Sequence, residues 1–191
     1  EVEEQANGLA SLIQGSGGYS IGYAKNDADK FAVTALLSRS DIAAQFDSQL
    51  LFMWDEKQKF TDPPSNTKKG WYLYACRIPD NGKPRVNGND ISYADADFDP
   101  QDRNKRIVEL TMTDAGMDKW SRMTSENINR LVAITMDNVV YSAPRVINAI
   151  NQGKTQITGD FSIAESTDLA GLLNGGALPA PLIVKEKTKV G

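Results

Sequence analysis

The sequence predicts an α+β protein in which antiparallel sheets carry helices on one face. Short apolar runs typical of strands alternate with segments in which apolar residues recur at helical spacing. In the last third of the chain these segments follow the order strand, helix, strand, strand, helix, strand, which is that of a ferredoxin-like split βαβ unit. A length of 191 residues allows one domain or two small lobes.

In the first half, Asn26 or Asp27 is a suitable N-cap for a helix, because both side chains accept hydrogen bonds from backbone N–H groups. Polar residues over 57–70 predict a long loop or hairpin connection. The expected elements are helices over Glu1–Gln14, Asp27–Leu37 and Asp41–Phe46, and strands over Leu50–Trp54 and Trp71–Ile78.

The second half is more regular. Asp137-Asn138 predicts a tight turn, and Ser162 with Glu165 forms the pattern of a helix capping box. The expected elements are strands over Arg106–Met112 and Leu131–Met136, a strand beginning at Val139, and helices that begin after Thr113 or Asp114 and after Ser162.

Composition excludes several functions. The net charge of −4 disfavours a nucleic-acid partner, since binding phosphates requires a basic surface. The chain has no histidine, which removes histidine-based catalysis and metal sites. The single cysteine, Cys76, lies in a predicted strand, where a free thiol is usually buried. We therefore expect no enzyme activity and no cofactor.

An acidic segment over 90–102 offers a second interpretation. Asp95-x-Asp97-x-Asp99 matches the opening of an EF-hand calcium loop, but Pro100 replaces the glycine of the sharp turn and Arg106 replaces the bidentate glutamate. A solvated acidic loop is therefore favoured over a calcium site. The alternative function that this segment leaves open is a stand-alone periplasmic calcium- or ligand-binding module.

Over about 91–191 the sequence resembles one protein family, and four of the matching motifs occur in the order that the family has. They are residues 131–144, similar to LAIVLDGxVxSAP; 156–162, similar to xITGxFT; 165–173, similar to EAxxLAxxL; and 176–182, which reads GALPAPL. The family is SecD, an accessory subunit of the bacterial Sec protein-export channel and a member of the RND superfamily. Residues 1–90 resemble the long insertion of SecD–SecF fusion proteins from Bacteroides-like bacteria.

The resemblance implies a domain on the periplasmic side of the inner membrane, belonging to a membrane-embedded parent protein. In that family SecD works with SecF beside the Sec channel, and it grips emerging unfolded preprotein while the proton-motive force drives late translocation. The resemblance also implies an inserted, membrane-distal head lobe over 1–104, and a βαββαβ-like lobe over 105–191 that leads into the base and the next transmembrane helix.

Gripping unfolded polypeptide requires exposed apolar surface or a free sheet edge. The expected preprotein contacts are Phe60, Trp71 and Tyr72, chosen from a wider set of first-half aromatics that also includes Phe52, Trp54, Tyr74 and Tyr93. Core packing is the competing role for each of them. We expect Gly176, Pro179 and Pro181 to form a stiff joint to the membrane part, since proline restricts backbone freedom.

Overall fold

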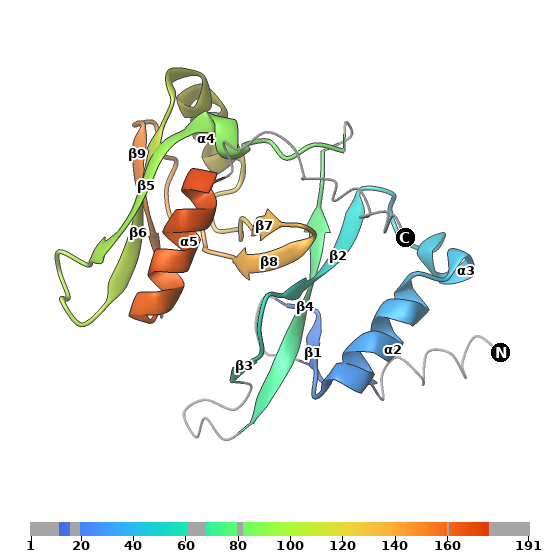
Figure 1. Ribbon diagram of the computed structural model, residues 1–191. Helices are drawn as coiled ribbons and strands as arrows, with labels where there is room; N and C mark the ends of the chain where they lie inside the picture. The colour runs from blue at the N-terminus through green and yellow to red at the C-terminus, as the bar shows by residue number, and fades with distance from the viewer. Residues whose placement is uncertain (1–11, 16–19, 61–67, 80–81, 160, 176–191) are drawn as a thin grey trace, which may run out of the picture. The chain divides into compact units, whose positions relative to one another are not determined.

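A computed structural model describes residues 12–15, 20–60, 68–79, 82–159 and 161–175, with no side-chain description of Phe60. The chain divides into two compact units, each assembled from two segments (Figure 1). The first unit comprises Glu1–Arg85 and Thr124–Ala149, and the second comprises Val86–Met123 and Ile150–Gly191.

The first unit is built on a mixed sheet in the order β1-β4-β2-β8-β7, with β3 also paired to β4. β2 and β8 run parallel, and the other neighbours are antiparallel. The strands are β1 (Gly22–Ala24), β2 (Leu50–Asp55), β3 (Lys59–Phe60), β4 (Lys69–Arg77), β7 (Ile134–Met136) and β8 (Val139–Ser142).

Among the described residues before β2 lie the helices α2 (Asp27–Leu37) and α3 (Ser40–Ala43). The α2 helix begins as expected, because the Asn26 side chain accepts a hydrogen bond from Asp29 N at 2.8 Å. Val33 is fully buried, and so are Leu73 of β4 and Val140 of β8. The turn between β7 and β8 is also as expected, since Asp137 and Asn138 both have positive φ, at 51° and 61°.

The second unit contains a three-stranded antiparallel sheet in the order β5-β6-β9. Helix α5 packs against β5 and β6, as Figure 1 shows. The elements are η1 (Gly88–Asp90), β5 (Ile91–Phe98), β6 (Arg106–Met112), α4 (Asp114–Glu126, whose end falls in the first unit), β9 (Lys154–Thr158) and α5 (Ile163–Gly175).

The start of α5 confirms the capping box. Ser162 N donates to Glu165 Oε2 at 2.7 Å, and Glu165 N donates to Ser162 Oγ at 3.2 Å. Each side chain thus satisfies a backbone N–H that the first helical turn leaves without a partner.

The α+β class with largely antiparallel sheets is confirmed, but the strand pairing differs from a single βαββαβ unit. β6 pairs with β5 and β9, whereas β7 and β8 join the sheet that contains β2. β6 has no free side for the β7–β8 hairpin, and the apolar Val140 is buried beside β2 instead. The expected boundary between a membrane-distal head lobe over 1–104 and a second lobe over 105–191 that leads into the base stays a prediction.

The acidic segment was wrongly expected to be a loop. β5 occupies Ile91–Phe98, and its side chains alternate between the two faces of the sheet. The small side chain of Ala94 is buried, whereas Tyr93 and Asp95 on either side of it are exposed. The strand is supported by burial of the small Ala94 side chain, and one buried alanine is a weak signal in a sequence.

Candidate functional site

A partly open apolar groove lies in the first unit, between the helices α2 and α3 and the strand β2. Its volume is about 370 Å³. The side chains that line it are mostly apolar or small: Thr34, Leu37, Ser38, Ala43, Phe46, Asp47, Ser48, Leu50, Leu51, Phe52 and Trp54.

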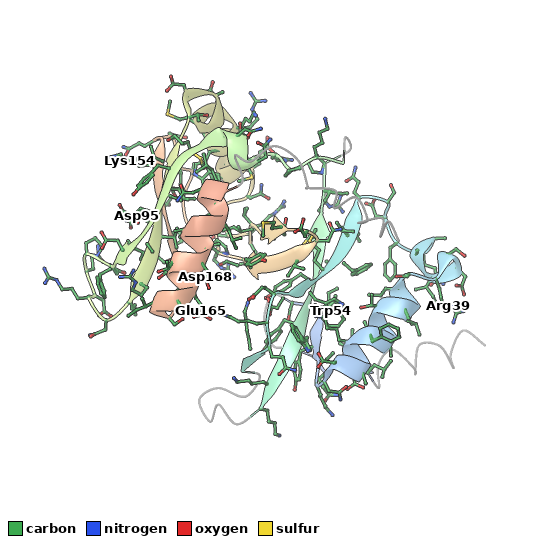
Figure 2. The ribbon with its side chains drawn as sticks, in the orientation of Figure 1. Arg39, Trp54, Asp95, Lys154, Glu165 and Asp168 are labelled. Carbon is green, nitrogen blue, oxygen red and sulfur yellow. The ribbon has the colours of Figure 1, made fainter. Side chains whose placement is uncertain are left out.

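Trp54, labelled in Figure 2, ties one wall of the groove to the other. Its indole Nε1–H donates to Thr34 Oγ1 at 2.9 Å, and that hydroxyl donates to Lys30 O at 2.8 Å. The hydroxyl of Thr34 is thus oriented by its own helix and presents a lone pair to the indole. This arrangement fixes the ring of Trp54 in the groove wall.

Phe46 and Phe52 form a second aromatic contact. Their ring centroids lie 4.9 Å apart at an interplanar angle of 72°, an edge-to-face geometry that aromatic pairs prefer. Phe46 remains 38% exposed, so part of its aromatic surface is open to solvent at the groove.

The backbone of β2 also faces outward beside the groove. Ile78 N donates to Gln49 O at 2.8 Å, and Glu56 N donates to Val140 O at 2.9 Å. Since bonded residues alternate along a strand, the N–H and C=O of Phe52 point away from β4. β8 meets β2 only at Trp54 and Asp55, so the described strands leave the stretch Leu50–Met53 unpaired on that side.

The opposite face of this sheet holds a buried carboxylate. Asp55 is 1% exposed, and its Oδ1 accepts a hydrogen bond from Lys59 Nζ at 2.7 Å. Burial raises the pKa of Asp55, and the charge and hydrogen bond of Lys59 offset only part of that rise. Burial, with the nearby Asp55 charge, also raises the pKa of Tyr74. Burial likewise raises the pKa of the Cys76 thiol, which makes it a poor nucleophile.

The acidic residues of β5 do not converge on a common point. Asp95 and Asp97 accept bonds from the backbone N–H of Ala96 and Phe98, at 2.9 and 2.7 Å. Asp90 instead pairs with Lys119 Nζ at 2.6 Å. Within the described part of the chain, no group of three acidic, cysteine or histidine side chains is placed to hold a metal ion.

Comparison with known proteins identifies the family. The family model described as "SecDF, P1 head subdomain" matches residues 71–180, which is more than half of the chain. The chain belongs to the SecD/SecDF family. Among the helices that the structure describes, none is both long and apolar enough to cross a membrane.

Curated relatives of this SecD-family chain are protein translocase subunits. SecD of Rhodothermus marinus is 32% identical over 163 residues, which are 85% of this chain and 25% of the relative. SecDF of Thermus thermophilus is 38% identical over 112 residues, which are 59% of this chain and 15% of the relative. The chain thus spans a quarter or less of the length of these relatives.

Two solved structures are among those that this chain matches. A structure of SecDF, described as a membrane component that enhances protein export, matches 94% of this chain and 86% of its own at 22% identity and a TM-score of 0.44. A crystal structure of SecDF in a super-membrane-facing form matches 94% of this chain and 26% of its own at 24% identity and a TM-score of 0.45.

The structure does not bring the expected contacts Trp71 and Tyr72 of this SecD-family chain together. They are neighbours in β4 and therefore lie on opposite faces of the sheet. Lys30 Nζ lies 3.5 Å from the ring centroid of Trp71, on the α2 side, whereas the ring of Tyr72 packs 5.7 Å from that of Tyr23.

The other expected site residues lie outside the described part. They are the side chain of Phe60 and the joint residues Gly176, Pro179 and Pro181. The sequence had already singled out Phe52 and Trp54 among the wider set of aromatics. Phe46 and Leu37 were missed, although an aromatic residue that ends a short helix just before a strand was an available signal.

Proposed function

We propose that this chain is the periplasmic P1 domain of a SecD-type subunit, and that it binds emerging unfolded preprotein during late, proton-motive-force-driven translocation. Its partners in this role are SecF, the Sec channel and the preprotein, at the periplasmic side of the bacterial inner membrane. It acts by binding and not by catalysis. The observation that carries the proposal is the open aromatic groove beside an outward-facing strand edge.

The groove suits apolar side chains of varied shape. Phe46, Phe52 and Trp54 provide aromatic surface, and Leu37 adds an aliphatic wall. Burying one large apolar side chain gains about 1.5–3 kcal/mol, part of which offsets the loss of chain freedom. One or two such side chains give weak and quickly reversible binding, which is what a moving, unfolded chain requires.

The edge of β2 adds a way to bind a preprotein that does not depend on the preprotein's amino-acid sequence. An extended chain beside Leu50–Met53 can exchange hydrogen bonds with the N–H and C=O of Phe52. Every peptide carries these backbone groups, so such contacts serve many different preproteins. Side chains of the bound segment would alternate toward and away from the groove.

The charge at the groove is partly neutralised. Asp47 lines it, and Arg77 Nη2 lies 3.5 Å from Asp47 Oδ2. The side chains of Arg77 and Asp47 are 67% and 46% exposed, so their attraction contributes little to stability. The paired charge leaves the groove without a strong preference for acidic or basic preproteins.

The proposal is tested in the full-length protein with a defined preprotein stalled during export. A photo-crosslinking residue at position 46 should capture the stalled preprotein. The same residue at position 31 is the control, because Phe31 is 76% exposed and does not line the groove. Equal capture from both positions, or none from position 46, would exclude the groove as the contact surface.

A further inference from the structure

The outer edge of β5, in the second unit, is closed by side chains. Among the strands that the structure describes, β5 is the terminal strand of its sheet, and Asp99 N donates to Lys105 O at 3.0 Å. Bonded residues alternate along an antiparallel pair, so this bond fixes which groups face β6. The groups that point away from β6 are the N–H and C=O of Ala94, Ala96 and Phe98.

Asn174, near the end of α5, holds both outward groups of Ala94. Ala94 N donates to Asn174 Oδ1 at 2.8 Å, and Asn174 Nδ2 donates to Ala94 O at 2.7 Å. A carboxamide has the same donor and acceptor as a peptide group. Asn174 therefore makes the two bonds that a residue of a neighbouring strand would make.

Three of the four remaining outward groups are also engaged by side chains. Ala96 O accepts from Arg106 Nη2 at 3.2 Å, and Ala96 N donates to Asp95 Oδ1 at 2.9 Å. Phe98 N donates to Asp97 Oδ1 at 2.7 Å. The guanidinium of Arg106 lies 4.3 Å from the ring centroid of Phe98 and its Nε donates to the buried Ser166.

We infer that the outer edge of β5 is a strand-acceptor site for an extended polypeptide, and that Asn174 keeps it closed. A row of backbone donors and acceptors repeating every second residue matches only another extended chain. The group that already bonds Ala94 is the side-chain amide of Asn174. An added strand would supply the same kind of group, a peptide amide. Tyr93 and Phe98, 57% and 49% exposed, would give the added strand apolar contacts.

This inference rests only on the contacts of β5. It is therefore independent of the groove between α2, α3 and β2. The bonds from Asp95 and Asp97 come from side chains of β5 itself, and both carboxylates can turn to solvent. Asn174 differs because it comes from another element and bonds two groups at once. It is therefore the residue that an entering strand has to displace.

The test compares Asn174→Ala with the unchanged chain, using a labelled seven-residue peptide of alternating threonine and valine. Removing Asn174 frees the Ala94 groups, so the variant should bind this peptide at least about tenfold more tightly, as expected when a competing pair of hydrogen bonds is lost. The same peptide N-methylated at every amide should not gain, because it cannot donate to the strand through either edge. Asn151→Ala is the matched control, since Asn151 accepts from Ser121 in the same unit, away from β5.

A folded Asn174→Ala chain that binds no more tightly than the unchanged chain would overturn the inference. So would an equal gain with the N-methylated peptide. If the alanine variant does not fold, Asn174→Asp replaces it, since a carboxylate keeps the acceptor for Ala94 N and loses the donor for Ala94 O. Hydrogen exchange at Ala96 and Phe98 should then slow with excess peptide, and unchanged exchange would overturn the inference.

Discussion

The α-carbon of Gly116, in the first turn of α4, lies so close to the carbonyl of Asp90 that any side chain would overlap it. A Cβ at this position would lie 2.9 Å from the carbonyl carbon of Asp90 and closer still to its oxygen. That oxygen also accepts from Thr113 N at 2.9 Å. The end of η1 and the start of α4 therefore pack through backbone atoms.

Gly116→Ala should destabilise the second unit by about 1–3 kcal/mol, the usual cost of overpacking, because backbone atoms have to move. The control is Gly171→Ala in α5, where a Cβ meets nothing within 4 Å. That change should stabilise by up to about 1 kcal/mol, the helix preference of alanine over glycine. Urea unfolding of both variants measures the difference, and equal stabilities would refute this account of Gly116.

The Asp90 carboxylate should stabilise the fold at neutral pH. Burial raises its pKa, but bonds from Lys119 and from Asn87 N outweigh burial, so the pKa lies below its usual value. A depressed pKa gives stability that is present above the unfolded pKa of about 3.9 and is lost as pH falls through the folded value. Asp90→Asn should cost about 1.5–3 kcal/mol at pH 7, the range for hydrogen bonds to charged groups, and much less at low pH. A cost independent of pH, measured by urea unfolding, would contradict this.

Asp55 should behave in the opposite way. Its pKa is raised chiefly by burial, despite the partner Lys59. The folded state then favours the protonated acid, so stability falls as pH rises from the ordinary pKa through the raised one. Asp55→Asn should therefore gain stability relative to the unchanged chain as pH rises from 4 to 7. Melting curves at several pH values test this, and a relative loss that grows with pH would show that the Lys59 pair dominates.

Local patterns predicted their elements well, because the interactions that make them are close in sequence. Ser162 and Glu165, three residues apart, form hydrogen bonds with each other. The tight turn at Asp137-Asn138 requires only that these two residues adopt positive φ angles. The strand partners were not predictable in this way. The pairing of β6 with β5 and β9 depends on which edges remain free after folding, and β5 depends on alanines that pack beneath α5.

The candidate site was only partly predictable for the same reason. Phe52 and Trp54 were recognisable as aromatics of a strand, but the groove also requires Phe46 and the end of α2. The contact between Phe46 and Phe52 arises from the turn between α3 and β2. Trp71 and Tyr72 were chosen by residue type and lie on opposite faces of β4, so their contact with preprotein stays a prediction.

The expected stiff joint at Gly176, Pro179 and Pro181, which lie outside the described residues, gives a prediction for the full-length protein. Replacing Pro179 and Pro181 with glycine should impair export, because glycine loosens a backbone that proline restricts. The folded units should keep their melting temperature, since the change lies after α5. Export measured in cells that carry the variant decides this, and unchanged export would count against a stiff joint.

Affinity for unfolded polypeptide tests the central claim most directly. The measurement is fluorescence anisotropy of a labelled, reduced and carboxymethylated model polypeptide, titrated with the unchanged chain, Phe46→Ser and Phe31→Ser. Phe46 lines the groove at 38% exposure, whereas Phe31 is more exposed and lies outside it. We predict that Phe46→Ser weakens binding about tenfold or more, the effect of losing about 1.5–3 kcal/mol of apolar burial, and that Phe31→Ser leaves it unchanged. Binding that is equally strong in all three chains, or absent from the unchanged chain, would contradict the account.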